Sequence, residues 1–312
     1  MTKKIYKYFS SDVLKLAFLR EGFCGVKCSL PKDYNDPYEL FLGVDLTLEP
    51  ELLATYRDII QELLQHPTTC FSLSPTVTPM WAHYGANHSG FILEFDADEL
   101  QTAFTDLAVR DVMYKDKPDD KIARFLEMAA GTKKPRHAVG LQAAVLSEAY
   151  FSKHTSWSYE QECRLVDDSQ YCEAVGLNQI LFIPITCVSS IIVGKNISDE
   201  AKKLSLEIAD TNDLAWHSTV IGKSTAQPFF LNRNGEAAVF DGGGIALADN
   251  TCSSCSEPVS ADASRCPWCS ITEAQERNAA MGNPLRMLDR FGLLGDYYAS
   301  VEAIRRQHQS DN

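Results

Sequence analysis

Two cysteine pairs near the C-terminal end place the strongest constraint on how this chain can fold. Two residues separate Cys252 from Cys255 and Cys266 from Cys269, and ten residues lie between the pairs. Each pair can chelate one metal through two thiolates on a tight turn, and two pairs complete a tetrahedral sulfur shell that suits zinc. The alternatives are two local disulfides or a redox pair, but no thioredoxin-like strand and helix flank either pair. We therefore predict a structural zinc ribbon over residues 251–270.

The predicted zinc ribbon is small, so the metal is expected to supply much of its folding free energy. Between the outer cysteines Arg265 is basic, whereas Glu257 and Asp262 are acidic. This balance lacks the basic footprint of nucleic-acid binding and favours protein contact or structural capping. Residues 271–312 are predicted to form a helical tail, broken near Pro284, whose apolar face packs on the main domain or on a partner.

The composition indicates a globular, acidic chain. Its 312 residues are 45% hydrophobic, which allows a large core, and the net charge of −13 opposes nonspecific association with nucleic acid or anionic membranes. Residues 133–137 are a local basic spot, either an ordinary solvated loop or a phosphate contact. No apolar run reaches the roughly 20 residues that span a bilayer, and no apolar segment follows the N-terminal lysines. We expect a cytoplasmic protein without membrane contact, whose other cysteines are reduced.

Residues 1–222 are predicted to form one α+β domain, because strand-like and helix-like segments follow one another without a regular repeat. The composition then changes toward turn residues and glycine. Turn pairs occur at Asn234-Gly235 and at Asp241-Gly242. Such pairs are typical of tight turns. Residues 223–250 are therefore predicted to be a hairpin-like or mobile connector to the zinc ribbon.

The segment "TSWSYEQECRLV", residues 155–166, is predicted to be a β-strand that carries three charges on one face. Side chains alternate along a strand, so Glu160, Glu162 and Arg164 would point the same way. Two explanations are open: the Glu-Arg pair makes a half-exposed sheet face soluble, or the three charges belong to a functional site. The segment "MWAHYGANHSG", residues 80–90, is predicted to be one short helix, in which Tyr84 and His88 share a face.

Five motifs succeed one another along residues 6–221: "YKYFS", "LPKDYNDPYE", "CFSLS", "MWAHYGANHSGFILEF" and "SWSYEQECRL". This succession resembles a widespread bacterial family of uncharacterised domains. Members of that family show a Y-x-Y-x-S start, a turn like F-N-D-P-F-E, an F-S strand, M-W-x-H-Y-x-x-x-H-x-G and W-x-x-E-x-E-x-R, in the same order.

That layout in turn resembles divergent ADP-ribosyltransferases, whose site is spread over three strands. They have a basic residue on the first strand, a hydroxyl-bearing motif on a second, and Glu-x-Glu or Gln-x-Glu late in the domain. In this sequence Lys7 corresponds to the basic residue of the first strand, the "SLS" of residues 72–74 to the hydroxyl-bearing motif, and Glu160 with Glu162 to the Glu-x-Glu. Lys7 replaces the more common Arg or His, and "SLS" is only similar to Ser-Thr-Ser. The resemblance implies a mixed-sheet ADP-ribosyltransferase-like domain that uses NAD as its substrate.

The resemblance also implies roles for individual residues. Glu162 would stabilise the oxocarbenium charge that develops as the nicotinamide–ribose bond breaks, and Glu160 would help to deprotonate the acceptor. Tyr84 or His88 would stack on nicotinamide or orient a ribose, unless both belong to an aromatic packing face. The other dinucleotide contacts would come from Lys7, Tyr8, Ser72, Ser74 and Arg164. The acceptor would be a macromolecule, protein or nucleic acid, and the resemblance suggests a toxin or phage-defence effector.

Two other functions stay open from the sequence. A metal-dependent nuclease or other hydrolase would use Glu160, Glu162 and His88. A non-catalytic interaction protein would recruit partners through the zinc ribbon and the helical tail. The sequence contains no Gly-rich phosphate loop, no His-Glu-x-x-His motif and no nucleophile elbow, which excludes several common enzyme classes.

Overall fold

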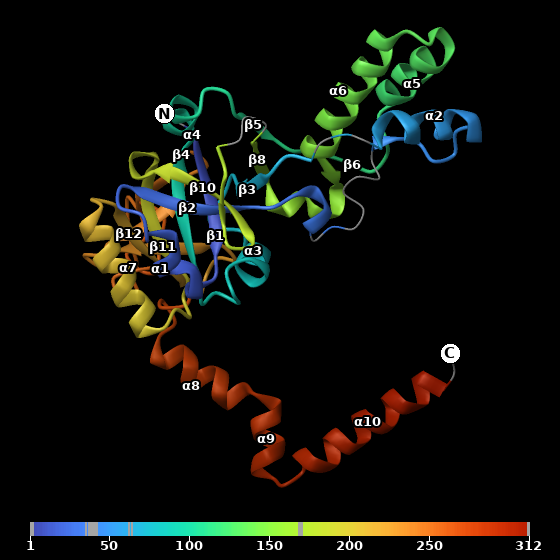
Figure 1. Ribbon diagram of the computed structural model, residues 1–312. Coiled ribbons are helices and arrows are strands. Elements are labelled where there is room, and N and C mark those ends of the chain that lie inside the picture. The colour runs from blue at the N-terminus through green and yellow to red at the C-terminus, as the bar shows by residue number, and fades with distance from the viewer. Residues whose placement is uncertain are drawn as a thin grey trace. The chain divides into compact units, whose positions relative to one another are not determined.

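A computed structural model describes residues 3–34, 36, 43–61, 63, 65–167 and 171–310. Four positions of the expected turn "LPKDYNDPYE", residue 35 and residues 37–39, therefore lie outside the described residues. Backbone contacts divide the chain into two compact units, Met1–Ala248 and Asp249–Asn312 (Figure 1). Among the described helices, none combines the length and the hydrophobicity that crossing a membrane requires.

The first unit contains a mixed sheet with ten described strands, in the order β15-β14-β13-β12-β11-β4-β1-β3-β8-β5. The strands are β1 (Lys4–Phe9), β3 (Thr68–Ser72), β4 (Phe91–Asp96), β5 (Ala108–Asp111), β8 (Glu162–Val166), β11 (Val188–Val193), β12 (Ala215–Ile221), β13 (Pro228–Asn232), β14 (Ala237–Phe240) and β15 (Ile245–Leu247). The pair β11–β12 is parallel and is connected through helix α7 (Asp199–Thr211). The predicted mixed α+β architecture is confirmed.

Shorter elements surround this sheet. A second sheet consists of β2 (Phe23–Cys28), β10 (Asn178–Pro184) and β9 (Glu173–Val175), and β6 (Met113–Lys115) pairs with β7 (Ser152–His154). The remaining helices of the first unit are α1 (Leu14–Ala17), α2 (Pro50–Ile60), α3 (Thr78–His83), α4 (Ala97–Ala103), α5 (Asp120–Thr132) and α6 (Pro135–Phe151), with 3-10 turns at Ser11–Val13, Pro31–Asp33, Thr155–Glu160 and Ile185–Cys187.

Strand β1 is covered on both faces, because its side chains alternate between two hydrophobic clusters. Ile5 is fully buried in the larger cluster, which continues through the second sheet and α7. Tyr6 and Tyr8 point the other way and pack with Trp81 of α3. A strand near the middle of a sheet that is covered on both sides needs such apolar or aromatic residues at successive positions.

Helices α2, α5 and α6 form a separate three-helix layer that we call the helical arm (Figure 1). Helix α5 turns Ile122, Leu126 and Ala129 inward at the three- and four-residue spacing of one helix face. Leu141 and Val145 of α6 complete this small core. Helix α2 comes from the segment between β2 and β3, whereas α5 and α6 lie between β6 and β7, so the C-terminal end of α6 runs directly into β7.

The predicted connector at residues 223–250 contains strands, as its hairpin-like alternative expects, but these strands belong to the first unit instead of linking it to the zinc ribbon. Its residues 228–247 form β13, β14 and β15, which extend the large sheet beyond β12 through antiparallel pairing. The predicted turn pairs lie between these strands. The strands pair because Phe229, Phe230 and Ala238 are buried, so apolar burial outweighs the glycine content that suggested mobility.

The second unit begins at the cysteine pairs and ends in three helices, α8 (Glu273–Gly282), α9 (Pro284–Arg290) and α10 (Leu294–Ser310). The predicted break near Pro284 is present, since Asn283 caps α9 with its side chain. A second break follows α9, where Gly292 takes a positive φ of 72°. Side chains expected to form a packing face, including Leu293, Tyr298 and Ile304, are exposed.

We expect Gly90→Ala to destabilise the first unit by about 3 kcal/mol, because a Cβ at residue 90 would lie 2.0 Å from the carbonyl oxygen of Phe9. The matched control is Gly131→Ala in α5, where a Cβ meets open space and removal of a helical glycine stabilises by about 0.5–1 kcal/mol. Urea unfolding of both variants measures the difference. Equal stability of the two variants would contradict the close packing of β1 against residue 90.

Candidate functional site

A cavity of about 270 Å³ lies in the first unit where β1 and β3 part. Its lining comes from β1, β2, β3, β7, β8 and the ends of neighbouring turns. The lining residues are Tyr6, Lys7, Tyr8, Lys27, Ser29, Asp33, Tyr34, Thr68, Cys70, Phe71, Ser72, Met80, Tyr84, Lys153, Glu160, Glu162 and Arg164. Segments that lie far apart in the sequence therefore contribute polar side chains to one space.

The strand register explains why the cavity lies here. Strand β1 pairs with β4 over six positions but with β3 only at Tyr6↔Ser72. Strand β3 pairs with β8 along its whole length, and there Ser72 is opposite Glu162. Tyr6, Ser72 and Glu162 therefore form one row across three adjacent strands. Beyond this row β1 and β3 separate, and Lys7 donates from its Nζ to the Cys70 carbonyl oxygen across the gap, at 2.9 Å.

The predicted strand over residues 155–166 is present only in its C-terminal part. Thr155–Glu160 is a 3-10 helix, Gln161 takes a left-handed conformation with φ 46°, and β8 begins only at Glu162. Ser72 donates from its Oγ to the Glu160 carbonyl oxygen at 2.7 Å, which secures the end of the 3-10 helix against β3. This local fold turns Glu160 back toward Glu162, although the two residues do not alternate along a strand.

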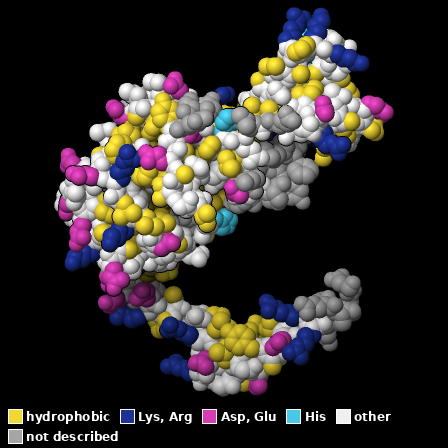
Figure 2. Space-filling model, in the orientation of Figure 1, with side chains coloured by type: hydrophobic (Ala, Val, Ile, Leu, Met, Phe, Trp, Pro, Cys, Tyr) yellow, Lys and Arg dark blue, Asp and Glu magenta, His cyan; other side chains and the backbone are white. Residues whose placement is uncertain are grey.

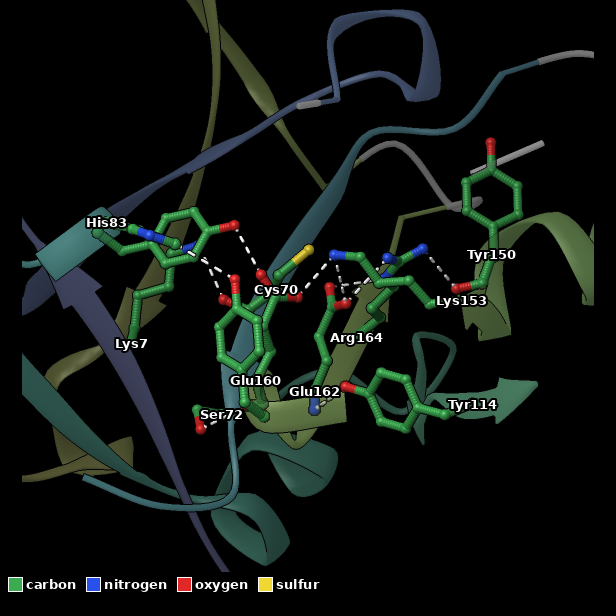
Figure 3. Close-up of polar contacts among 12 residues, drawn as sticks. Lys7, Cys70, Ser72, His83, Tyr114, Tyr150, Lys153, Glu160, Glu162 and Arg164 are labelled. Carbon is green, nitrogen blue, oxygen red and sulfur yellow. Dashed lines mark hydrogen bonds and ion pairs between the residues drawn. The ribbon is translucent and has the colours of Figure 1, made fainter. Parts of the chain in front are cut away.

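Two carboxylates and two cations form a buried network in the cavity (Figure 3). Lys153 Nζ lies 2.6 Å from Glu160 Oε2 and 3.3 Å from Glu162 Oε2. Arg164 donates from Nε to Glu162 Oε1 at 2.7 Å and from Nη2 to Glu162 Oε2 at 2.9 Å. Tyr84 donates to Glu160 Oε1 at 2.7 Å. Each carboxylate oxygen of the pair thus has a protein donor.

Further contacts hold the network in place from behind. Arg164 donates from Nη1 to the carbonyl oxygen of Tyr150 at the end of α6, at 3.0 Å. The backbone N–H of Glu162 donates to Tyr114 Oη at 2.8 Å, and Lys153 Nζ lies 4.8 Å from the centre of the Trp157 ring. The cation–π contact and the two carboxylates surround the Lys153 ammonium on several sides.

Burial and charge act in opposite directions on the titration of these groups. Burial opposes the charged form of Lys153, but Glu162 and Glu160 outweigh it, so the pKa of Lys153 is raised above its ordinary value. Burial raises the pKa of Glu162, against the opposing effect of the Lys153 charge. Burial lowers the pKa of Arg164 to about 10, which leaves it a cation at neutral pH. The half-exposed Glu-Arg pair considered from the sequence is therefore not what the structure contains, since Arg164 is 1% exposed.

The structure brings most of the predicted site residues together. The predicted residues that line the cavity are Lys7, Tyr8, Ser72, Tyr84, Glu160, Glu162 and Arg164. Ser74 is buried beside the site but outside the lining, where its carbonyl oxygen accepts from Tyr8 Oη and its Oγ lies 2.9 Å from that of Thr76. This placement concerns geometry; the chemical roles of these residues stay predictions.

His88 is not part of the cavity, because the predicted helix over residues 80–90 ends early. Helix α3 stops at His83, and Ala86, Asn87 and His88 all have positive φ. The chain thereby turns away from the helix, and the His88 ring stacks on Trp81 with centroids 6.0 Å apart. The predicted common face of Tyr84 and His88 is wrong, and His88 has a packing role.

Sequence reasoning missed several lining residues, of which Lys153 is the most important. Lys153 lies in the short strand β7 directly after α6, in a segment with no recognisable motif, and its contact with Glu160 depends on the turn that follows β7. Cys70 and Tyr34 were also missed, because they belong to segments whose mutual approach is decided by the sheet. The one sequence feature that could have indicated Lys153 is its position only a few residues before the Glu-x-Glu motif.

The four cysteines of the second unit form a cluster that fits a metal ion. The Sγ atoms of Cys252, Cys255, Cys266 and Cys269 all lie within 4.8 Å of one another. Sulfurs about 2.3 Å from a tetrahedral zinc are about 3.8 Å apart, and Sγ of Cys255 and Cys266 are 3.8 Å apart. The clustering of these cysteines, predicted from their spacing, is confirmed, and the donor set is compatible with structural zinc.

The fold and the site together define an α+β protein with a buried charge network in a sheet cavity and a separate four-cysteine unit. A family described as a protein of unknown function, DUF2971, matches residues 80–165. The matched segment runs from within α3 to residue 165 of β8, so it includes Lys153, Glu160 and Glu162. The match agrees with the predicted resemblance to an uncharacterised family. The chain matches no curated protein and no solved structure at a significant level.

Replacing Lys153 by Met is expected to destabilise the protein by about 3 kcal/mol at pH 8, because one cation is removed from a buried pair of carboxylates. Without Lys153, the pKa of Glu162 should rise further. A carboxyl with a raised folded-state pKa favours folding most at low pH and loses this contribution as the pH rises through that pKa. The loss should therefore be smaller at pH 5 than at pH 8.

Urea unfolding at both pH values measures this effect, and Lys7→Met serves as the control. Lys7 lines the same cavity but bonds a backbone carbonyl, so its replacement should cost about 1 kcal/mol without pH dependence. A Lys153→Met loss that is equal at pH 5 and pH 8 would show that the carboxylates do not depend on this cation.

Purified protein is expected to contain about one zinc per chain. Cys266→Ser should remove the metal and unfold the four-cysteine segment, while the first unit melts as in the unmodified protein because the two units are separately compact. Elemental analysis and thermal unfolding provide the measurements. Cys172→Ser is the control, since Cys172 lies outside the cluster and should leave the zinc content unchanged. Zinc-free protein prepared under reducing conditions without chelators would refute the prediction.

Proposed function

We propose that the first unit is an NAD-dependent ADP-ribosyltransferase-like enzyme that modifies a macromolecular acceptor. The observation that supports this most is the convergence of Lys7 from β1, Ser72 from β3 and Glu162 from β8 on one cavity. The resemblance places a basic residue, a hydroxyl motif and a catalytic glutamate on three strands. Here those strands are direct neighbours, with Ser72 and Glu162 in register.

The charge of the cavity fits a ligand that carries phosphate. Within the lining, four cations (Lys7, Lys27, Lys153 and Arg164) stand against three carboxylates (Asp33, Glu160 and Glu162). Lys153 and Arg164 are already paired with the two glutamates, so Lys7 and Lys27 remain for an anionic group. A diphosphate near these two lysines would gain from their charge.

The size of the cavity limits which part of the dinucleotide it receives. A volume of about 270 Å³ is just below the usual range of small-molecule pockets, about 300–1,000 Å³. We expect the nicotinamide riboside half to enter, while the adenosine half lies toward the mouth. The aromatic lining residues Tyr6, Tyr34 and Tyr84 offer surfaces for the nicotinamide ring.

The chemistry follows from the buried carboxylates. As the bond between ribose C1′ and the nicotinamide nitrogen breaks, nicotinamide leaves as a neutral molecule and positive charge develops on the ribose. The ionised Glu162 stabilises that charge in a site of low dielectric. The acceptor nucleophile then forms the new bond to C1′, and its proton passes to Glu160. Tyr84 and Lys153 orient Glu160, because each of them donates a hydrogen bond to one of its carboxylate oxygens. The acceptor must therefore reach a carboxylate that already has these two donors.

The metal-dependent hydrolase suggested from the sequence has less support. Among the described residues, the cysteine cluster is the only place that gathers three or more potential metal ligands. His88, which that function would need beside Glu160 and Glu162, packs on Trp81 instead. The glutamates are neutralised by Lys153 and Arg164, which leaves little charge to attract a cation.

We expect Glu162→Gln to lower NAD cleavage at least a hundredfold, because it removes the charge that stabilises the oxocarbenium. Glu160→Gln should weaken transfer to the acceptor more than hydrolysis of NAD. The measurements are nicotinamide release and labelled ADP-ribose adducts in a cell lysate. Glu94→Gln is the matched control, because Glu94 is also buried, at 6% exposure, on the nearby strand β4 but outside the cavity.

Each variant is checked by urea unfolding, since Glu162 is ion-paired and its replacement also lowers stability. Activity is compared only at denaturant-free conditions in which both variants are folded. A folded Glu162→Gln protein that cleaves NAD as fast as the Glu94→Gln control would refute the proposed role of Glu162.

A further inference from the structure

The outer end of the helical arm carries a basic surface that the cavity does not use. Lys133, Lys134 and Arg136 are exposed in the turn that joins α5 to α6, and Figure 2 shows Lys and Arg side chains gathered there. In the sequence no acidic residue occurs between Glu127 and Glu148. The whole chain has a net charge of −13, so the rest of it carries −13 − 3 = −16. The turn is thus a local positive patch on a protein whose net charge is negative.

The turn is ordered by its own contacts. Lys133 closes α5 in a left-handed conformation, with φ 54°. Thr132 Oγ1 lies 2.5 Å from His137 Nδ1, and Arg136 donates from Nε to His137 Nε2 at 3.1 Å. Helix α6 starts at Pro135 without a side-chain cap, so the positive end of its dipole adds to the charge of the turn. The cations are therefore presented from a defined backbone.

Aliphatic side chains accompany these cations. Met128 of α5 is 47% exposed and Val139 of α6 is 62% exposed, each within about one helical turn of the basic segment. Over residues 126–147 the sequence contains no Phe, Tyr or Trp on which a nucleic-acid base could stack, and the His137 ring is bonded to Thr132 and Arg136. A long polyanion would also meet the −16 carried elsewhere. The exposed cations would pair with carboxylates, and their aliphatic neighbours would contact aliphatic side chains. A short protein segment that carries both kinds of side chain therefore complements this surface.

We propose that this basic turn is a docking site for a segment of a protein partner that is rich in acidic residues and leucine. The 17 residues of α6 span about 25 Å from the turn to Tyr150, whose carbonyl oxygen is bonded by Arg164. A docked partner would thus be held at the far end of the helix that leads into the cavity wall. The docking does not depend on the proposed transferase chemistry.

The test measures binding of defined probes to the full chain by fluorescence anisotropy. The first probe is a fluorescein-labelled peptide of Glu-Glu-Leu repeats, the second is the same peptide with Gln in place of Glu, and the third is a single-stranded RNA of equal length. The test variant is Lys133→Gln/Lys134→Gln/Arg136→Gln. The matched control, Lys15→Gln/Lys195→Gln/Lys203→Gln, removes the same charge from exposed positions of the first unit outside the arm.

The acidic peptide is expected to bind the unmodified protein and the control variant equally, and the test variant about tenfold more weakly, because three exposed ion pairs are lost. The Gln peptide should not bind, and added salt should weaken the acidic peptide. Absence of binding, an equal loss in both variants, or tighter binding of the RNA would overturn the proposal. None of these results depends on NAD turnover, so they leave the proposed enzymatic function separately testable.

Discussion

The buried network of Lys153, Arg164, Glu160 and Glu162 is the interaction on which the rest of the first unit depends. All four side chains are at most 4% exposed. Removing one member would leave an uncompensated charge in a region of low dielectric, which is far more costly than losing a surface pair. The surrounding chain therefore has to keep these groups together. The left-handed Gln161, the 3-10 helix before it and the end of α6 all serve this geometry.

The network also determines what the cavity can recognise. Because its two cations balance its two carboxylates, the net charge that a ligand meets is decided by other lining residues, chiefly Lys7, Lys27 and Asp33. The separation of β1 from β3 beyond Tyr6↔Ser72 opens the space in which they lie. On one side of this register pair the sheet is continuous. On the other side the described strands β1 and β3 have backbone groups that do not pair with each other, and the cavity lies between them.

The parts of the chain are stabilised in different ways. The sheet unit has a large apolar core, the helical arm has a small core of its own, and the cysteine unit has mainly its four thiolates. Different physical forces therefore hold these parts: apolar burial in the first two and the expected metal coordination in the third.

Local patterns in the sequence determined the cysteine cluster, the α+β class and strands such as β4, because ligand spacing and apolar periodicity act over a few residues. They also pointed to Glu160, Glu162 and Arg164, although only Glu162 and Arg164 lie on the strand that was expected to carry all three. Only the tertiary structure decided that Lys153 joins the two glutamates, that His88 leaves the site, and that residues 228–247 extend the sheet. Lys153 is only seven residues from Glu160, but whether the two meet depends on the turn conformations between them and on the strand pairing around them. The rest of the fold stabilises these features, and the spacing of residues along the sequence does not specify them.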